Sequence, residues 1–555
     1  MKKLPDFNDH IKAGGEIPDV VEASDPWPEA VEGAPADAGD DFLDFVASDK
    51  SRHKTKIVWR PGDLTGYVDE VERVLVRCGA RCYAYGDTIA AVVWNASAVR
   101  PARTVMLDQD RVVALLAANI RWFKVICTRN GDEQEVPTDP PPIVARQLLA
   151  NDHRRLPVLK ALVHVPVLLP TGRLVSKPGF DEDSGVFAAF QPERFAQLKA
   201  NPTQADAAES MRQLLALFDD FYFDHPAGRF AAIAAVITLA CRSAIEGAVP
   251  MVLVTASTPG TGKSLLVSVI TAIGSGKEAA RMAQTDDTEM EKRITSALAA
   301  GADAIVIDNA KDAIGCPALD ALLTTSGDWQ GRILGESRTV NLPARAVVFA
   351  TGNNLKLAGD LQRRVLPISL LAKQERPEER QDFKLKDLLG HVVEHRDRLA
   401  TAAITILHAY MLSPEKVEPA LLGSYGNWSR LVRGAVMWAG GLDPVATREQ
   451  LVAESDDVKL AWAELLVMLR AEYGTEEFVA ANVVQFLGEQ ESVNIRDVLF
   501  GERAADGKSV GQLFKRWKGR IVGTLSLDVT PLKTGGLKHW VVVDCGATDQ
   551  EDRQP

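Results

Sequence analysis

The stretch from Ser257 to Leu265 carries the residue types that bind a triphosphate. It reads Ser-Thr-Pro-Gly-Thr-Gly-Lys-Ser-Leu, follows the apolar run Val252–Val254, and precedes apolar residues at helical spacing. A strand, a glycine-rich turn ending in Gly-Lys-Ser, and a helix are the context of a phosphate-binding loop. Backbone N–H groups and a helix N-terminus attract phosphate oxygens there. The predicted nucleotide-binding residues are Thr258, Pro259, Gly260, Thr261, Gly262, Lys263, Ser264 and Leu265.

ATP and Mg²⁺ are the ligands that this pattern implies. Lys263 is expected to reach the β- and γ-phosphates, and the Ser264 hydroxyl to bind Mg²⁺. The apolar run 304–307 ends in Asp308, and a carboxylate at a strand tip beside such a loop holds the metal. Ser264 and Asp308 are therefore the predicted metal ligands. The alternative is a glycine-rich turn without a ligand.

Two amides form the next candidate group. The strand-like run 346–350 leads into Asn353 and Asn354, and an amide at a strand end can bind the γ-phosphate or position water. Two positions depart from the usual ATPase pattern: Ser257 replaces the first loop glycine, and Asn309 stands where many ATPases have a glutamate base. Hydrolysis then needs another water-orienting group or is slow. The candidates Glu291 and Glu336 share only the domain with this site.

An arginine pair follows in Gly-Asp-Leu-Gln-Arg-Arg-Val, residues 359–365. An arginine here can reach the nucleotide of a neighbouring subunit. The alternative is a pair of solvated charges at Arg363 and Arg364.

This series of motifs, over about residues 202–372, resembles the superfamily III, AAA+-type helicase module of phage and plasmid primase-helicases. It is similar to the helicase half of poxvirus-type primases. The resemblance implies an α/β P-loop NTPase core, an ATP-hydrolysing DNA helicase, and a homo-oligomeric ring, with a hexamer as the expected size. It gives Lys263 and Ser264 the Walker A roles and Asp308 the Walker B role. It makes Asn353 or Asn354 the sensor and Arg364 the arginine finger.

Two basic regions predict DNA contacts. Residues 329–338 are polar, glycine-punctuated and basic, which suits a hairpin; in ring helicases of this type the hairpin touches single-stranded DNA. Arg332 and Arg338 are its expected phosphate contacts, and an ordinary surface hairpin is the alternative. The C-terminus shows a basic amphipathic helix and two strands around Gly535-Gly536, which suggests a winged helix. Its predicted DNA contacts are Lys515, Arg516, Lys518, Arg520, Lys533 and Lys538; a protein-binding winged helix is the alternative.

The chain of 555 residues is too long for one core. The expected segments are an acidic flexible stretch 1–54, an α+β domain 55–190, a helical collar 191–250, the ATPase core 251–375, a helical subdomain 376–490 and the winged-helix-like region 491–555. Short words near Asp6 resemble the tail of a Toprim primase domain, so the resemblance leaves room for a separate primase as partner.

The composition limits the surface charge, the compartment and the membrane association that we expect. The net charge of −12 excludes a surface that is basic throughout, although a ring can be acidic outside and basic within. The six scattered cysteines indicate reduced thiols of a cytoplasmic protein, bacterial or of a phage-infected host. No apolar run is long enough to span a membrane.

The sequence favours an ATP-dependent DNA helicase from a phage or mobile-element replication system, which translocates on single-stranded or forked DNA. Two alternatives stay open. One is a replication initiator or loader that binds DNA and uses ATP only to assemble. The other is an ATPase assembly protein of an anti-phage system with a protein partner.

Overall fold

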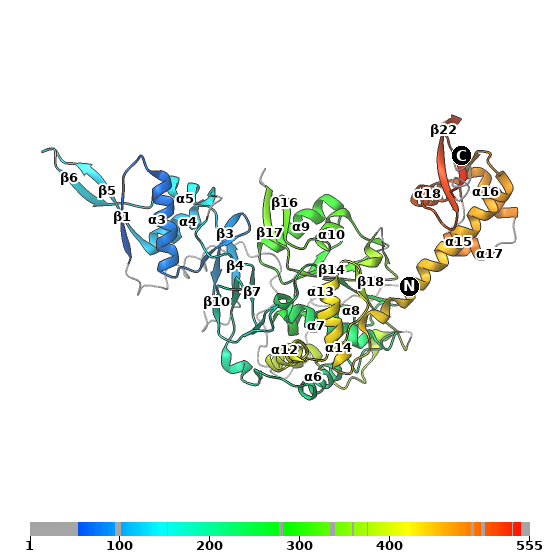
Figure 1. Ribbon diagram of the computed structural model, residues 1–555, viewed down its shortest axis with the longest axis horizontal. Helices are drawn as coiled ribbons and strands as arrows, with labels where there is room; N and C mark the ends of the chain where they lie inside the picture. The colour runs from blue at the N-terminus through cyan, green and yellow to red at the C-terminus, as the bar shows by residue number, and fades with distance from the viewer. Residues whose placement is uncertain are drawn as a thin grey trace, which may run out of the picture. The chain divides into compact units, whose positions relative to one another are not determined.

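The structure, a computed structural model, describes residues 54–94, 102–151, 154–276, 279, 281–311, 313–332, 339–357, 360–374, 376–489, 493–500, 506–534 and 537–545. The chain divides into two compact units, Met1–Thr447 and Arg448–Pro555 (Figure 1). The acidic N-terminal segment, Arg338 and Glu336 fall outside the described residues, as does the Gly535-Gly536 turn.

A five-stranded parallel sheet forms the centre of the first unit. Its strand order is β13–β14–β18–β12–β20, and every neighbouring pair is parallel. The long strands are fully buried along most of their length, which matches their runs of Val, Ile and Ala. Their bounds are Met251–Ala256 (β12), Arg281–Ala283 (β13), Ala304–Ala310 (β14), Val347–Asn353 (β18) and Val365–Leu370 (β20). This is an α/β core with the P-loop candidate at the end of β12.

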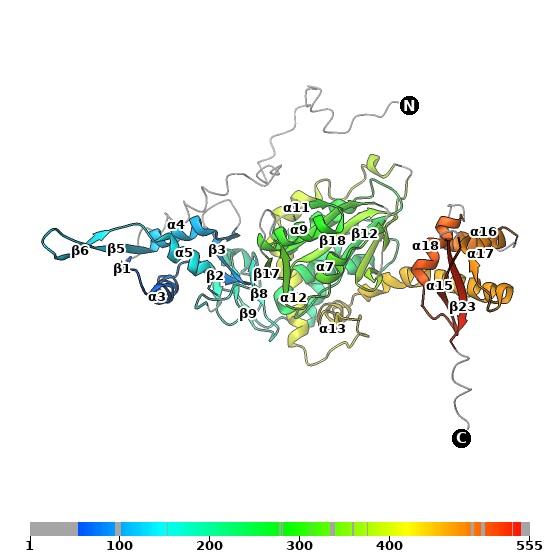
Figure 2. The ribbon, with the colours of Figure 1, turned by 90° about the horizontal axis from the view of Figure 1, so that it is seen from above.

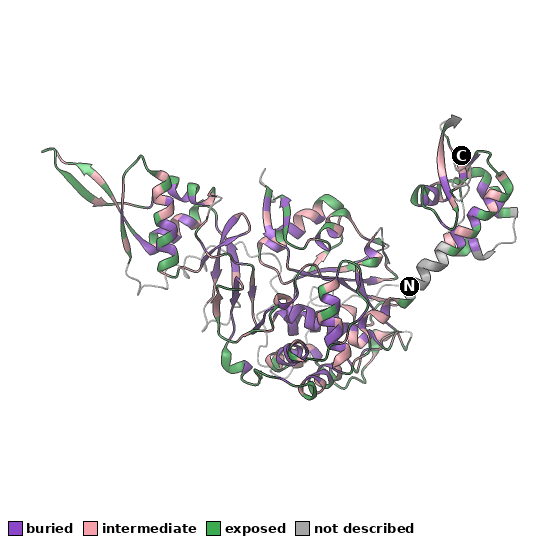
Figure 3. Ribbon diagram, viewed as in Figure 1, coloured by how far each residue is buried: buried purple, intermediate pink, exposed green. Residues whose placement is uncertain are grey.

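Helices pack on the sheet in layers. α8 (Lys263–Ser275) contacts β12, β14 and β18, and α7 (Gly228–Ala240) contacts α8 and β20. α12 (Arg396–Leu412) packs on both, and α6 (Gln204–Ala216) packs on α12. One hydrophobic core joins all of these elements, and α7 is buried over most of its length (Figure 3). The helices expected as a separate collar therefore share the core of the sheet.

The remaining helices before the unit boundary lie close to this core. They are α11 (Leu388–Glu394), α13 (Gly426–Trp428), a π-helical turn (Ser429–Arg433) and α14 (Gly434–Trp438). Trp428 is fully buried, and its Nε1–H donates to Thr238 Oγ1 of α7 at 2.8 Å. This bond ties the segment after α12 to the helix beneath the sheet.

The N-terminal part has its own core, formed by Val71, Leu75, Leu116, Trp122 and Leu148 among others. It comprises α3 (Leu64–Arg77), α4 (Gln109–Asn119) and α5 (Pro142–Leu149) with two three-stranded sheets (Figure 2). The sheets are β1–β5–β6 and β2–β3–β4, with bounds Thr55–Trp59, Ile120–Cys127, Glu133–Pro137, Cys82–Tyr85, Thr88–Val93 and Arg103–Met106. An α+β arrangement is thus present here.

Short strands link this part to the core of the five-stranded sheet. They are β7 (Ala161–Val163), β8 (Val167–Leu168), β9 (Leu174–Val175), β10 (Gly179–Asp181) and β11 (Val186–Ala188). Val165, Leu168 and Phe190 belong to the core of the large sheet. The packing boundary therefore lies well before the expected one at residue 190, because these short strands bury their apolar residues against the helices that pack on the five-stranded sheet.

A hairpin stands beside α9 (Asp287–Ala299). Its strands β16 (Asp328–Arg332) and β17 (Thr339–Pro343) are antiparallel, as expected from the sequence. Trp329 is buried, and its Nε1–H donates to Thr295 Oγ1 of α9 at 3.0 Å. The base of the hairpin is thus fixed to α9. Neighbouring elements are α10 (Pro317–Leu322), β15 (Ala313–Ile314) and β19 (Lys356–Leu357).

The second unit contains a three-stranded antiparallel sheet of order β21–β23–β22 and four helices. The helices are α15 (Glu449–Tyr473), α16 (Ala480–Glu489), α17 (Val493–Phe500) and α18 (Gly507–Trp517); the strands are Phe478–Val479, Leu537–Asp544 and Leu525–Thr534. Trp462, Phe478, Phe514 and Trp540 meet in its core. The unit begins at Arg448, not at residue 491, because α15 and α16 complete this core.

In the described part of the chain, every helix is too short or too polar to cross a membrane.

Candidate nucleotide-binding site

The loop between β12 and α8 needs its two glycines. Gly260 and Gly262 have φ of +78° and +87°, the left-handed region that favours glycine. A Cβ on Gly260 would lie 2.6 Å from a carboxylate oxygen of Glu378, and one on Gly262 would lie 3.2 Å from the ring of Phe221. Conformation and space both select glycine here. The missing first glycine, Ser257, is exposed, and its Oγ lies 3.4 Å from Thr258 Oγ1.

Lys263 is the first residue of α8 and is half-buried. Its Nζ donates to the Thr258 carbonyl at 3.3 Å and to Thr261 Oγ1 at 3.2 Å, so the ammonium group folds back over its own loop. Burial lowers the pKa of Lys263, and the charge of Asp308 opposes part of that decrease. Both contacts are long for hydrogen bonds, so they can be exchanged for stronger bonds to an anion.

Asp308 lies near the end of β14 and receives three side-chain donors. The Ser264 hydroxyl donates to its Oδ1 at 3.0 Å and the Thr351 hydroxyl at 2.5 Å, while Arg281 Nη1 lies 2.6 Å from Oδ2. Burial acts to raise the pKa of Asp308, but the bonds from Thr351 and Arg281 outweigh it, and the pKa stays below its ordinary value. Asp308 is therefore an anion held at the loop.

The separation of Ser264 and Asp308 suits a magnesium ion. Two neighbouring ligands of an octahedral ion, each at about 2.1 Å, lie about 3 Å apart. The Ser264 hydroxyl and the Asp308 carboxylate oxygen are 3.0 Å apart. Hydroxyl, carboxylate, phosphate and water oxygens are the ligands that this ion prefers. The residues present thus fit Mg²⁺.

Arg281 and Thr351 are functional candidates that sequence reasoning missed. Besides its contact with Asp308, Arg281 donates from Nη2 to the Ser264 carbonyl at 3.2 Å and to Ser268 Oγ at 2.5 Å. The guanidinium of Arg281 thus lies against Oδ2 of Asp308. Thr351 also accepts from the backbone N–H of Asn309 at 2.9 Å. The sequence signal for Thr351 was its position: a hydroxyl residue directly before Gly352-Asn353, on the strand next to that of Asp308.

The two predicted amides, Asn353 and Asn354, lie at the same edge of the sheet but differ in their contacts. Asn353 ends β18 and pairs in register with Ala256, the last residue before the loop. Its Oδ1 is buried without a hydrogen-bond partner among the described residues. Asn354 has φ of +47°, and its N–H donates to the Ala256 carbonyl at 3.1 Å, so its backbone closes the strand end. Because an amide oxygen accepts hydrogen bonds, Asn353 is the stronger candidate to position a water molecule at this edge.

Asn309 and Glu291 do not supply an evident base. Asn309 is exposed, has φ of +51°, and carries an amide that cannot accept a proton from water. Glu291 lies on α9 and lines a groove with Pro317, Thr325 and Trp329. Among the described candidates, this leaves Asn353, with its unpartnered Oδ1, as the side chain that can orient water.

The arginine pair differs from the expectation. Arg364 donates from Nη1 to the carbonyl and carboxylate of Asp320 at 2.8 and 2.9 Å, and from Nη2 to Asp360 at 2.9 Å. Its side chain is 19% exposed, whereas that of Arg363 is 82% exposed and has one ion pair with Asp360, at 3.1 Å. Arg364 is thus bonded to residues of its own chain. The family resemblance had instead made it the arginine that reaches the nucleotide of a neighbouring subunit. Arg363 is the freer of the two.

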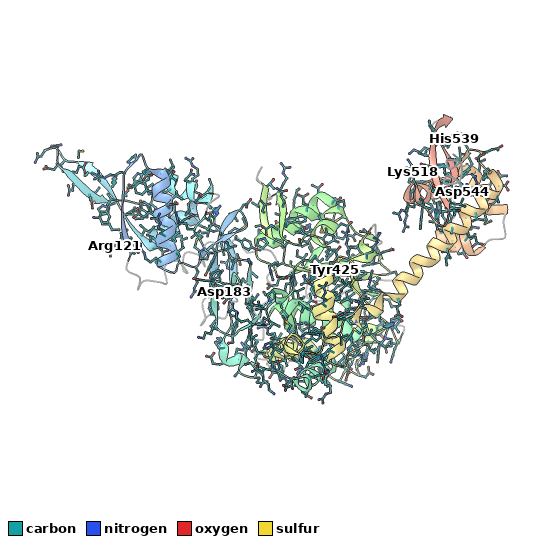
Figure 4. All side chains as sticks on the ribbon, viewed as in Figure 1. Arg121, Asp183, Tyr425, Lys518, His539 and Asp544 are labelled. Carbon is teal, nitrogen blue, oxygen red and sulfur yellow. The ribbon has the colours of Figure 1, made fainter. Side chains whose placement is uncertain are left out.

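The predicted DNA contacts fall in two places. Arg332 is exposed at the end of β16, opposite Thr339, on the last described residue pair before the hairpin tip. In the second unit, five of the predicted contacts are exposed: Lys515, Arg516, Lys518, Arg520 and Lys538. Lys518, labelled in Figure 4, lies 3.8 Å from Asp528, and Arg520 lies over the ring of Trp517. Lys533 faces Lys538 in register on the strand pair, although its side chain lies outside the description.

No protein-family model matches the chain. No curated protein matches it either. Among solved structures, the apo A form of the NrS-1 C terminal region is similar at 12% identity and a TM-score of 0.32, covering 76% of this chain and 96% of that one. A second structure of that region, residues 305-718, gives 10% identity and a TM-score of 0.34 with 85% and 98% covered. JCV helicase is similar at 13% identity and a TM-score of 0.18, with 43% and 67% covered. All three TM-scores are below 0.5 and describe a distant similarity.

Proposed function

We propose that this protein is an ATP-dependent DNA helicase of the superfamily III, AAA+ type, acting as a ring on single-stranded DNA. One observation carries the proposal: Lys263, Ser264 and Asp308 converge at the carboxyl edge of a parallel sheet, with the serine hydroxyl 3.0 Å from the carboxylate. That edge is where open α/β sheets bind ligands.

Each residue has a distinct task in this account. The loop N–H groups and Lys263 bind the β- and γ-phosphates, in place of the two internal contacts of the ammonium group. Ser264 and Asp308 hold Mg²⁺, which would neutralise charge that develops on the phosphates. Arg281 must then give up its contact with Asp308. Asn353 offers its unpartnered Oδ1 to the attacking water.

The arginine from a neighbouring subunit is assigned to the Arg363–Arg364 pair. The exposure of Arg363 supports it as the group that reaches across, and the ion pairs of Arg364 with Asp320 and Asp360 support a positioning role. A hexamer remains the expected assembly.

DNA contact is assigned to the hairpin and to the second unit. The hairpin is anchored at Trp329, so its Arg332 end projects from a fixed base. The second unit has the helix, strand and hairpin order of a winged helix, with exposed basic residues on α18 and β23. Phosphate contacts of this kind bind without sequence preference.

The test is strand displacement on a forked substrate, with and without ATP, together with the rate of ATP hydrolysis with and without single-stranded DNA. The proposal predicts ATP-dependent unwinding and DNA-stimulated hydrolysis, both absent in Lys263→Ala. Hydrolysis without unwinding would contradict the helicase assignment.

A second candidate is a replication initiator or loader that uses ATP to assemble on DNA. The exposed Asn309 in place of a glutamate base favours it. DNA binding that depends on ATP, together with slow hydrolysis and no strand displacement, is its expected outcome.

A further inference from the structure

A small cavity lies within the first unit, away from the nucleotide loop. It has a volume of about 50 Å³ and is bounded by the C-terminal end of α8, the segment after α7, the strand β7 and the residues that follow β17. Its polar lining includes Lys160, Arg242, Ser243, Ser275, Asp303 and Arg345. The loop lysine lies at the other end of α8, at its first residue.

Two arginines face one another at this cavity without a carboxylate between them. Arg242 donates from Nη1 to the Ile245 carbonyl at 2.6 Å and from Nη2 to the Gly247 carbonyl at 2.7 Å. Arg345 donates from Nη2 to the Arg242 carbonyl at 3.0 Å. The Nε–H of each arginine is buried without an acceptor among the described residues. Buried N–H groups of charged side chains are costly when they lack an acceptor.

The charges around the cavity do not balance. Burial, together with the nearby charge of Arg345, lowers the pKa of Arg242 to about 9. Burial also lowers the pKa of Arg345. The one acidic residue of the lining, Asp303, acts on a third buried arginine, Arg396. An anion in the cavity would relieve the repulsion and supply the missing acceptors.

The volume of the cavity limits the anion to a small one. Because about 10–15 Å³ is the least that admits one water, a cavity of about 50 Å³ has room for a small oxyanion such as phosphate or sulfate. Two guanidinium groups, the Ser243 hydroxyl and the nearby Lys160 are suitable donors for such a tetrahedral oxyanion. The Ser275 hydroxyl already donates to the Thr271 carbonyl at 2.8 Å.

We propose that the cavity between Arg242 and Arg345 is a binding site for a free phosphate-like oxyanion, separate from the nucleotide loop. The site does not depend on the proposed helicase function. Arg345 comes two residues after the end of β17. A bound oxyanion would therefore fix the base of the hairpin to the ends of α7 and α8.

The experiment uses the full chain carrying Lys263→Ala, which removes the loop lysine as a source of phosphate binding. Binding of radiolabelled inorganic phosphate is measured by equilibrium dialysis in buffer free of phosphate and sulfate, and the melting temperature is followed as phosphate is added. The proposal predicts about one phosphate per chain and a melting temperature that rises with phosphate concentration. Absence of binding, or an equal rise with chloride at the same ionic strength, would overturn it.

Variants locate the binding. Adding Arg345→Gln is expected to abolish both responses, whereas Arg345→Lys retains part of them because the charge remains. Arg212→Gln, on an exposed arginine of α6, is the matched control and leaves them unchanged. Binding that survives Arg345→Gln contradicts the site. Displacement of the phosphate by a single-stranded oligonucleotide would show a nucleic-acid site instead, and would overturn the assignment to a free ion.

Discussion

At the scale of single residues, the site is defined by what surrounds Asp308. Its carboxylate is shared among Ser264, Thr351 and Arg281, so it is already ionised and oriented before any metal arrives. Arg281 is the most informative of these partners, because its guanidinium binds Oδ2 of the same carboxylate whose Oδ1 faces the Ser264 hydroxyl. The guanidinium of Arg281 therefore supplies positive charge beside the carboxylate that would hold the metal.

Arg281→Ala should lower the Mg²⁺ concentration needed for half-maximal ATP binding, because Asp308 then loses the cation that occupies its Oδ2. Since a charged hydrogen bond contributes ~1.5–3 kcal/mol, an effect of about tenfold is expected. Titration of ATP binding with Mg²⁺ measures it. Arg293→Ala, whose guanidinium pairs with Glu289 on α9, is the control. A higher Mg²⁺ requirement in Arg281→Ala would contradict this account.

Local patterns predicted the core of this site. Two patterns can be recognised in the sequence: Gly-Lys-Ser between a strand and a helix, and an apolar run ending in Asp308. Both depend only on the periodicity of neighbouring residues. Arg281 was not predictable, because it sits on a three-residue edge strand, 27 positions from the carboxylate it contacts. The pairing of Arg364 with Asp320 was missed for the same reason: it depends on how α10 packs.

At the scale of elements, the helices beneath the sheet fix α8, and through it the loop. α7 is apolar on all sides and buried between the sheet and α12. Trp428 bonds to Thr238 of α7, so the segment after α12 is attached to the same layer. This arrangement makes the loop position depend on residues far along the chain.

Trp428→Ala should destabilise the first unit by about 3–5 kcal/mol, because it leaves a large cavity in a core where the indole is fully buried. Thr238→Val, which keeps the volume and removes the acceptor, should cost only about 1 kcal/mol. Urea unfolding followed by circular dichroism measures both. Equal losses for the two variants would show that packing of Trp428 is not the main contribution.

Sequence patterns indicated which segments are helical but not which core each helix joins. Trp462, Leu465 and Leu469 give α15 an apolar face like that of many helices. Only the packed structure shows that this face belongs with Phe514 and Trp540, which moves the unit boundary to Arg448. Long-range packing decides such boundaries, and one sequence does not display it.

At the scale of the whole molecule, the proposed function requires more than one copy of the chain and a nucleic acid. The acidic chain carries exposed basic residues on α18 and β23 of the second unit. Electrostatic contacts with phosphates weaken as salt rises.

Lys515→Ala and Arg516→Ala should each weaken DNA binding in the same way for different sequences. Each change should reduce the slope of log affinity against log salt by about 1, because one phosphate contact is lost. Fluorescence anisotropy with a labelled fork at several salt concentrations measures the slope. Arg496→Ala, at an exposed arginine of α17 in the same unit, is the control. An unchanged slope for both variants would favour a protein-binding role for this unit.

Substitutions of Arg363 and Arg364 should have different effects, because the two side chains differ in exposure and in contacts. Arg363→Ala is expected to abolish turnover while ATP still binds, and activity should return on mixing with Lys263→Ala subunits, which supply the missing arginine at a shared site. Arg364→Ala should instead lower the melting temperature, because it breaks ion pairs with Asp320 and Asp360. Rescue of Arg364→Ala but not of Arg363→Ala by mixing would reverse the assignment.

The most direct test of the central claim is the affinity of Mg²⁺–ATP for the wild-type chain and for Lys263→Ala, measured with a fluorescent ATP analogue alongside the melting temperature. The account predicts a loss of about 10–100-fold in affinity, with the melting temperature unchanged, because the lysine makes only two weak internal contacts. Equal affinity in the two folded proteins would mean that no triphosphate lies at this loop.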